Sequence, residues 1–408
     1  MAYPGTSEEV PQPDRWLTPG VRGIGAASLL SDLGHEVPTS LLPAFLTSTL
    51  GAPVAALGII EGISDGLAGL ARLGGGALAD DPHRRRNVAV GGYTATAVMT
   101  AGIGLATGVW QVAVLRAGAW TARGLRVPAR NALLADSVAP EAYGRAYGFE
   151  RAMDNLGAIG GPLLAIGLVA AVGVRSAILV SVIPGLLAAL AIVYAVRHIA
   201  LPRKRARQPI RLRVRPVLRG RLGRAMGGIG AFELGNVAAT LLILRTTEQI
   251  GVTHGAERAT TIGLLLYAGY NLAATLTSIA AGHTGDRIGM IPVLGGGIAL
   301  FALAYGGFAV ATTSIVLLAV LFVAAGIGIG CVETAEHAVV ASLAPEGLRG
   351  SAFGLLAAVQ SFGNLVASSV AGILWTLVSP TAAFGYAAAC MLAALGLLAL
   401  LRSRDGDG

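Results

Sequence analysis

The sequence predicts an all-α membrane protein with twelve transmembrane helices, arranged as two pseudo-symmetric six-helix bundles. Two observations support this fold class: the composition and an internal repeat. Hydrophobic residues make up 54% of the 408 residues and charged residues only 13%, against about 25% in a soluble domain. Because each crossing of a bilayer needs about 20 mostly apolar residues, the chain has room for twelve crossings joined by short loops.

A repeat at one fixed offset divides the chain into two similar halves. Glycines and aspartates of the first half recur 206 positions later in the second half. The pairs are Gly76 and Gly282, Asp80 and Asp286, Gly144 and Gly350, and Gly148 and Gly354. Asp32 is echoed more loosely by Glu233. Several matches in the same order imply duplicated halves, and a repeat of this length in a membrane chain is typical of a transporter built from two bundles.

A basic stretch that contains prolines lies between the halves. A run of like charge with prolines is typical of a solvated linker, and we expect this one to bind lipid headgroups. The predicted order is a cytoplasmic tail over 1–20, a first six-helix bundle over 21–197, the basic linker over 198–223, a second six-helix bundle over 224–402 and a tail over 403–408. The seventh predicted span covers 224–249.

The basic residues also predict how the chain crosses the membrane. They gather in the linker and in short loops such as 83–86. Because cytoplasmic loops carry an excess of Lys and Arg, we expect a multi-pass protein of the bacterial plasma membrane with both termini in the cytoplasm. This pattern accounts for the net charge of +8, so no nucleic-acid partner is expected. The polar segment 1–18 has no apolar core and is not expected to be a signal peptide.

Two segments resemble the signature loop of the major facilitator superfamily. The first runs from Gly76 to Arg86, between the second and third predicted spans, and its copy runs from Gly282 to Arg287. The resemblance extends over essentially the whole chain at the level of topology. It implies two bundles that rock about a shared central pocket, and it implies a monomer without a cofactor.

A second resemblance lies in the fifth predicted span. Gly148, Gly157, Gly161 and Pro162 are similar to the motif of the superfamily's proton-coupled exporters, although Ala165 and Ile166 stand where that motif closes with glycines. Glycines of this kind permit close helix packing, and Pro162 permits bending. The alternative is that these residues serve helix packing alone.

The signature loops imply a gate on the cytoplasmic side. Glycines at helix ends let two helices approach closely, and the aspartates can bind arginines or helix N-termini across the interface. The resemblance implies that these contacts latch the inner side shut in the outward-facing state. At the repeat offset Glu336 matches Arg130, which predicts an ion pair between the bundles when this gate closes. The gating candidates are Gly76, Asp80, Arg126, Arg130, Gly282, Asp286, Glu336 and His337.

Ionisable residues within the spans predict proton coupling. A charge near the bilayer centre costs about 2.5–3.5 kcal/mol, so such residues must face a wet cavity or one another. Asp32, His35 and Glu36 share one face of the first span, and carboxylates in such a site can load and release protons. The proton-coupling candidates are Asp32, Glu36, His35, Asp154 and Glu150. The alternative is a buried network that only orders the bundle.

Further polar residues are expected to line the cavity. In the fourth span, Arg116, Arg123 and Arg130 recur every seven residues on one helical stripe, and arginine provides a fixed positive charge. The cavity and substrate candidates are Glu61, Asp65, Arg116, Arg123, Glu233, Asn236, Tyr267, Tyr270, Asn271, Glu333, Gln360 and Asn364.

The function that these features favour is secondary active transport, with protons exchanged for a small organic compound that leaves the cell by alternating access. One alternative is a transition-metal exporter, because several candidates are metal-capable, although no tight ligand pair occurs and no metal site is predicted. Another is an importer driven by proton symport. A non-transporting sensor or an intramembrane enzyme is least favoured, because the sequence lacks HExxH and its GxSxG match, Gly62 to Gly66, lies inside a predicted span rather than at a strand-to-helix turn.

Overall fold

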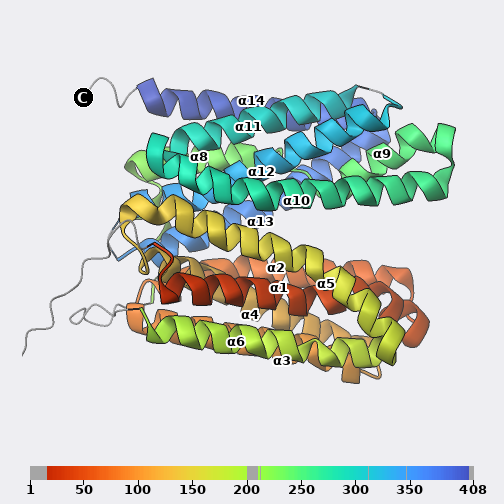
Figure 1. Ribbon diagram of the computed structural model, residues 1–408, viewed down its shortest axis with the longest axis horizontal. Coiled ribbons are helices and arrows are strands. Elements are labelled where there is room, and N and C mark those ends of the chain that lie inside the picture. The colour runs from red at the N-terminus through yellow and green to blue at the C-terminus, as the bar shows by residue number, and fades with distance from the viewer. Residues whose placement is uncertain (1–15, 200–209, 212, 311, 346, 404–408) are drawn as a thin grey trace, which may run out of the picture.

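The computed structural model describes residues 16–199, 210–211, 213–310, 312–345 and 347–403, and these residues are almost entirely helical (Figure 1). The first half contains α1 (Pro19–Ala44), the π-helical turn η2 (Phe45–Thr49), α2 (Val54–Ala79), α3 (Pro82–Gly102), η3 (Ile103–Leu105), α4 (Val109–Ala135), η4 (Pro140–Ala142), α5 (Tyr143–Val180) and α6 (Val182–Arg197). The second half contains α7 (Val214–Val217), α8 (Gly220–Glu233), α9 (Ala239–His254), α10 (Ala256–Ile288), α11 (Met290–Ala309), α12 (Ile315–Leu343), α13 (Arg349–Leu377) and α14 (Pro380–Ser403). Part of the predicted linker, 200–209 and 212, lies outside the described residues.

The helices α1–α6 pack as one bundle and α8–α14 as a second, and Figure 1 shows the two bundles one above the other. The chain reverses at Gly173, where φ is +79°, so α5 contains two antiparallel segments. With α5 divided there, residues 174–180 taken together with α6, and α8–α9 taken as one broken crossing, the described helices form six rods in each bundle, as the sequence predicts. Seven described stretches are long and apolar enough to cross a membrane, and one of them, Pro140–Arg197, contains this reversal. The remaining rods, α1, α2, α4 and α8–α9, carry ionisable residues.

Several helices begin at capping signals that the sequence contains. The Thr18 hydroxyl accepts a hydrogen bond from the Val21 amide at the start of α1, and Asp81 caps α3 in the same way. Proline follows each of these caps, at Pro19 and Pro82, where its missing N–H is not needed. These caps set both helix starts at the same end of the first bundle.

The span predicted over 224–249 is not a continuous helix, because residues 234–238 interrupt it between α8 and α9. At Gly235 the backbone approaches α14 so closely that a Cβ would lie 2.6 Å from the Cys390 Cβ. Side chains of α13 and α14 satisfy the backbone groups that the break frees. The Tyr386 hydroxyl donates to the Leu234 carbonyl (2.7 Å), the Asn364 amide donates to the Asn236 carbonyl (2.9 Å), and the Ser368 hydroxyl accepts from the Ala238 amide (2.9 Å). Such partners make irregular backbone tolerable at membrane depth.

The two bundles touch backbone to backbone at one end, which we call the closed end. It is formed by the last turns of α2 and α10 and the first turns of α13 and α5. A Cβ added at Gly76 would lie 2.7 Å from the Gly350 carbonyl oxygen, and one at Gly282 would lie 2.3 Å from that of Gly144. No side chain fits between helices at these distances, so glycine is required on both sides of the molecule. Figure 1 shows α5 and α10 side by side at this contact.

Replacing Gly282 by valine should therefore force the closed end apart. Overpacking of this kind costs about 1–3 kcal/mol, which would shift the protein measurably toward open conformations. We would measure the distance between spin labels at Glu141 and Ile288, exposed residues on opposite bundles at this end, after replacing Cys331 and Cys390 by alanine. In the matched control Gly269→Val, on the same helix, a Cβ meets nothing within 4 Å, and the distance should not change. Equal distances in both variants would contradict the contact.

Candidate functional site

A polar cavity of about 470 Å³ lies between the bundles. The first bundle contributes α2, α4 and α5 to its wall, and the second contributes α8, α12 and α13 together with the break between α8 and α9. Seven of the predicted cavity residues line it: Asp65, Arg123, Glu233, Asn236, Glu333, Gln360 and Asn364. Two of its glycines, Gly62 and Gly66, have open space where a side chain would lie.

Asp32, His35 and Glu36 form a chain of contacts on α1. His35 Nδ1 lies 3.3 Å from Asp32 Oδ1, and His35 Nε2 lies 3.3 Å from Glu36 Oε1. His35 Nδ1 also lies 2.9 Å from the Ser31 carbonyl, and because a carbonyl only accepts, Nδ1 carries the proton. Arg123 Nη2 is 3.6 Å from Asp32 Oδ1. Since Arg123 lines the cavity, it connects this predicted group to the cavity wall.

A second group links α2 to α4. Arg116 Nη2 lies 2.9 Å from Glu61 Oε1, and Arg116 Nη1 donates to the Thr39 hydroxyl at 3.1 Å. The guanidinium also lies 3.4 Å above the Trp120 ring, a cation–π contact. Trp120 Nε1 in turn donates to Asp65 Oδ1 at 2.8 Å. Glu61 and Arg116 therefore support the cavity wall from behind, whereas Asp65 and Trp120 line the cavity.

The acids of α5 are neutralised by two arginines. Glu150, fully buried, lies 2.7 Å from Arg130 Nη1 and 2.7 Å from Arg151 Nη2. Asp154 lies 3.4 Å from Arg130 and 3.2 Å from Arg151. The Ser28 hydroxyl donates to Glu150 at 2.6 Å. Charges buried at this depth persist only when paired and hydrogen-bonded, as these are.

Arg126, a gating candidate, is held inside the first bundle. Its Nη2 donates to the Ser31 hydroxyl at 2.6 Å, and its guanidinium lies 3.7 Å above the Tyr93 ring. Like Arg130 it is buried, at 3% exposure. Arg126 therefore joins α4 to α1 and α3, Arg130 joins it to α1 and α5, and the contacts of both arginines lie within the first bundle.

Glu233, the counterpart of Asp32, ends α8 at the break. It is 3% exposed and lines the cavity, and Asn236 Nδ2 donates to its Oε2 at 3.1 Å. Arg72, on α2, faces it across the cavity. The break in the helix thus presents an acid and an amide to the cavity.

Glu336 lies behind the cavity wall, fully buried on α12. Gln360 donates to its Oε1, and the other oxygen, Oε2, has no hydrogen-bond partner. His337 Nδ1 donates to the Glu333 carbonyl at 2.7 Å and is 3.7 Å from Glu336 Oε1. The predicted ion pair between Glu336 and Arg130 is therefore not formed in this conformation, because each residue finds its partners within its own bundle.

The remaining predicted cavity residues lie on α10, outside the lining of the cavity. The rings of Tyr267 and Tyr270 stack with centroids 5.6 Å apart, and Asn271 Nδ2 donates to the Tyr267 carbonyl at 3.0 Å. The polar groups of these residues make contacts along α10 itself. Their spacing in the sequence does not distinguish such contacts from the lining of a cavity.

The glycines of α5 act in close packing on both sides of that helix. A Cβ at Gly148 would lie 2.3 Å from the Ser278 carbonyl of α10. On the other side, a Cβ at Gly157 would lie 2.8 Å from the Asp32 Cβ, and one at Gly161 would lie 2.3 Å from the Glu36 Cβ. These glycines therefore bring the acid-bearing face of α1 against α5, and Pro162 follows within the same helix.

Two aspartates latch the closed end reciprocally. Asp80, after α2, accepts hydrogen bonds from the Ser351 amide (2.8 Å) and hydroxyl at the start of α13. Asp286, near the end of α10, accepts from the amides of Gly144 (2.7 Å) and Arg145 (3.1 Å) at the start of α5, and from Arg145 Nε (2.8 Å). Each carboxylate thus binds the positive end of a helix in the other bundle. Burial raises the pKa of the Asp80 carboxyl, and the bonds from Ser351 oppose that rise.

Sequence reasoning missed a third contact between the bundles. Arg349, the first residue of α13, lies 3.0 Å from Asp136 after α4, and its Nη2 donates to the Tyr143 hydroxyl at 2.7 Å. Arg85 also donates to Asp136. The repeat contains a signal for it, because Arg349 and Tyr143 occupy the same position in the two halves.

Sequence reasoning also left Arg72 and Arg151 out of the cavity, although both line it. Arg72 lies seven residues after Asp65, on the same helical stripe, which could have placed it there. It crosses to the second bundle, where Nη1 donates to the Ala357 carbonyl at 2.8 Å and to the Ser361 hydroxyl.

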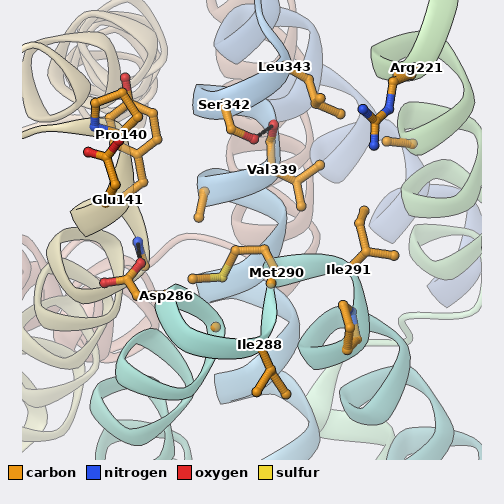
Figure 2. A pocket seen from close by; sticks show the side chains of 17 residues that line it. Pro140, Glu141, Arg221, Asp286, Ile288, Met290, Ile291, Val339, Ser342 and Leu343 are labelled. Carbon is orange, nitrogen blue, oxygen red and sulfur yellow. Dashed lines mark hydrogen bonds between the residues drawn. The ribbon is translucent and has the colours of Figure 1, made fainter. Parts of the chain in front are cut away.

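A second cavity, also of about 470 Å³, lies at the closed end (Figure 2). It is bounded by η4 and the start of α5, by α8, by the turn between α10 and α11, and by the end of α12. Figure 2 shows Asp286 and Met290 on one side of this space and Leu343 on another. A Cβ at Gly144 would lie 1.9 Å from the Met290 Cε, so this flexible side chain packs directly onto the latch.

Comparison with known proteins identifies the family. The sequence model of the Major Facilitator Superfamily matches residues 24–245 and again residues 226–407. The chain belongs to the major facilitator superfamily. An uncharacterised MFS-type transporter of Methanocaldococcus jannaschii is 27% identical over 378 residues, which is 91% of this chain and 92% of the relative.

Solved structures of this superfamily share the fold. A bacterial homologue of the iron transporter ferroportin, in its outward-facing state, has a TM-score of 0.78 and 16% identity, covering 94% of this chain and 99% of its own. The human organic anion transporter MFSD10 has a TM-score of 0.70 and 17% identity, covering 93% and 99%. The expected fold and family are confirmed, and the protein is a multi-pass membrane transporter.

A double-mutant cycle on Arg349 and Asp136 tests the missed contact. Each alanine variant should populate open conformations more than the wild type, measured with the same pair of spin labels. The coupling energy between the two sites should be about 1 kcal/mol, because both side chains are partly exposed. In the control cycle Arg349 is combined with Glu257→Ala, an exposed carboxylate at the other end of α10, and the effects should add. Additive effects in both cycles would exclude a stabilising pair.

Proposed function

We propose that this transporter exports a small organic compound from the cell in exchange for protons, by alternating access. The observation that carries the proposal is the combination of a polar cavity between the bundles with an end sealed by the reciprocal Asp80 and Asp286 latch. Opening that seal would expose the cavity to the other side of the membrane, and this is the motion that alternating access requires.

We assign the closed end to the cytoplasmic side. The basic residues at the start of α3, Arg84 to Arg86, lie at this end, and so do Arg215 and Arg219 at the start of the second half. An excess of positive charge marks the cytoplasmic side of membrane proteins. The conformation described here is then the outward-facing one, and both termini are cytoplasmic.

The cavity favours a polar or charged cargo of low molecular weight. Its volume falls within the range of about 300–1,000 Å³ typical of small-molecule sites. Arg72 and Arg123 line the wall from the first bundle, and Glu233 and Glu333 line the wall from the second. A compound with hydrogen-bonding groups would replace the water that these side chains need, whereas an apolar compound would leave them unpaired.

The test is transport by purified protein in lipid vesicles with an imposed pH gradient, using a panel of organic anions, organic cations, amino acids and divalent metal ions. We expect at least one organic compound to accumulate against its gradient when protons flow the opposite way. Accumulation in the direction of the protons would show a symporter instead, and flux of metal ions alone would show a metal exporter. No gradient-dependent flux of any member would contradict the proposal.

Filling the cavity should block this transport. In Gly66→Trp the indole enters open space in the cavity without a backbone clash, and we expect initial flux to fall by about tenfold or more. The matched control is Gly91→Trp on α3, at an exposed position where a Cβ also meets nothing within 4 Å. Undiminished flux in Gly66→Trp would show that cargo passes elsewhere.

A further inference from the structure

The two bundles treat their buried acids differently. In the first bundle, each carboxylate within the helices α1–α6 lies within reach of an arginine, histidine or tryptophan donor. These pairs are Asp32 with Arg123, Glu36 with His35, Glu61 with Arg116, Asp65 with Trp120, and Glu150 and Asp154 with Arg130 and Arg151. In the second bundle, Glu233, Glu333 and Glu336 have no arginine or lysine partner among the described residues.

Glu336 is the most isolated of these acids. It is fully buried, and Gln360 of α13 occupies only one of its two oxygens. Its Oε2 is buried with no partner. His337, the nearest base, donates its Nδ1 proton to the Glu333 carbonyl and not to Glu336, whose Oε1 lies 3.7 Å away.

The cations that face this region from the first bundle are already engaged. Arg151 of α5 pairs with Glu150 and Asp154 on its own helix, and Arg130 of α4 pairs with the same two acids. Arg72 of α2 donates to α13, at the Ala357 carbonyl and the Ser361 hydroxyl. The remaining groups around Glu336 are acidic or neutral: Glu233 of α8, Glu333 of its own helix, Gln360 of α13, and Tyr147 and Glu150 of α5.

Glu150 shows what a buried carboxylate needs in order to stay charged. It has the same full burial as Glu336, yet two arginines lie 2.7 Å away. An isolated carboxylate at this depth becomes neutral by binding a proton, because burying an unpaired charge costs several kcal/mol. Among the described residues, no group of three acids, histidines and cysteines could hold a metal ion. A proton is therefore the ligand that fits Glu336.

We propose that Glu336 binds the proton that this transporter exchanges for its cargo, at Oε2, while the closed end is shut. The identity of the coupled ion rests on the proposed function, but the occupancy of this site does not. The coupling proton then binds in the second bundle, and not at Asp32 and Glu36, which the sequence favours.

The position of Glu336 also explains how its proton would be released. The next residue, His337, packs its ring 5.8 Å from Tyr147 of α5 in the other bundle and 6.3 Å from Phe353 of α13. When the closed end opens, α5 withdraws from α12 and water reaches the carboxylate. Because burial favours the neutral form, the closed conformation holds the proton and the open one releases it. By the same linkage, acid should favour closure.

Infrared spectroscopy of the full chain in lipid nanodiscs tests the site without any cargo. At neutral pH, the wild type should show the carbonyl stretch of protonated carboxylic acid, and Glu336→Gln should lose about one such group per chain. Glu336→Asp, which keeps a carboxyl group, should retain the band at a shifted position and serves if Glu336→Gln does not fold. The matched control Glu150→Gln should leave the band unchanged, because the arginines keep Glu150 ionised.

A wild-type band in Glu336→Gln, or a Glu336→Asp band identical to that of the wild type, would overturn the assignment. So would a loss confined to Glu150→Gln. As a second readout, the spin-label distance across the closed end should shorten in the wild type from about pH 8 to about pH 5, and Glu336→Gln should remove that dependence. These outcomes can be told apart from those of the transport test. Proton-coupled flux without the Glu336 band would contradict only the assignment of the proton to Glu336. The band without any flux would contradict only the proposed function.

Discussion

The whole arrangement depends on one contact, in which a carboxylate from each bundle binds the first turn of a helix in the other. Asp80 binds α13 and Asp286 binds α5, and both depend on glycines that let the helix backbones meet. A side chain at Gly76 or Gly282 would separate the helices and remove the aspartate from its amide donors. The latch is made of a few hydrogen bonds, so it can form and break as the bundles move. The duplication provides it twice, on both sides of the same interface.

Buried charge is handled in two ways, and the difference gives each bundle a distinct role. The first bundle pairs its acids with arginine, histidine and tryptophan donors, and this network supports the cavity wall. The second bundle has acids and amides without matching cations, and its seventh crossing is broken at Glu233, which presents polar groups to the cavity. A paired carboxylate keeps its charge in any conformation. An unpaired one, such as Glu336, responds to whether water can reach it, and is therefore sensitive to the state of the nearby gate.

The sequence predicted the fold, the two halves and the family, because composition and a repeat at fixed offset report on the lipid environment and on duplication. It also predicted that Asp32, His35 and Glu36 lie together, since spacing along a helix determines which residues share a face. It did not predict the break at 234–238, because the partners that satisfy that backbone lie far away in the chain. For the same reason it missed Arg349, and it paired Arg130 with the wrong bundle in this conformation. Spacing gives the face of a helix, but which neighbour covers that face is decided by tertiary packing.

The most direct test of the central claim measures both ends of the molecule at once. Spin labels at Glu141 and Ile288 report on the closed end, and labels at Ser48 and Val252, exposed on opposite bundles, report on the other end. In a chain with both Asp80→Asn and Asp286→Asn, the first distance should lengthen while the second shortens, because weakening the latch lets the bundles rock toward the opposite state. If both distances stay at their wild-type values, or both lengthen together, the latch does not control the exchange between the two states.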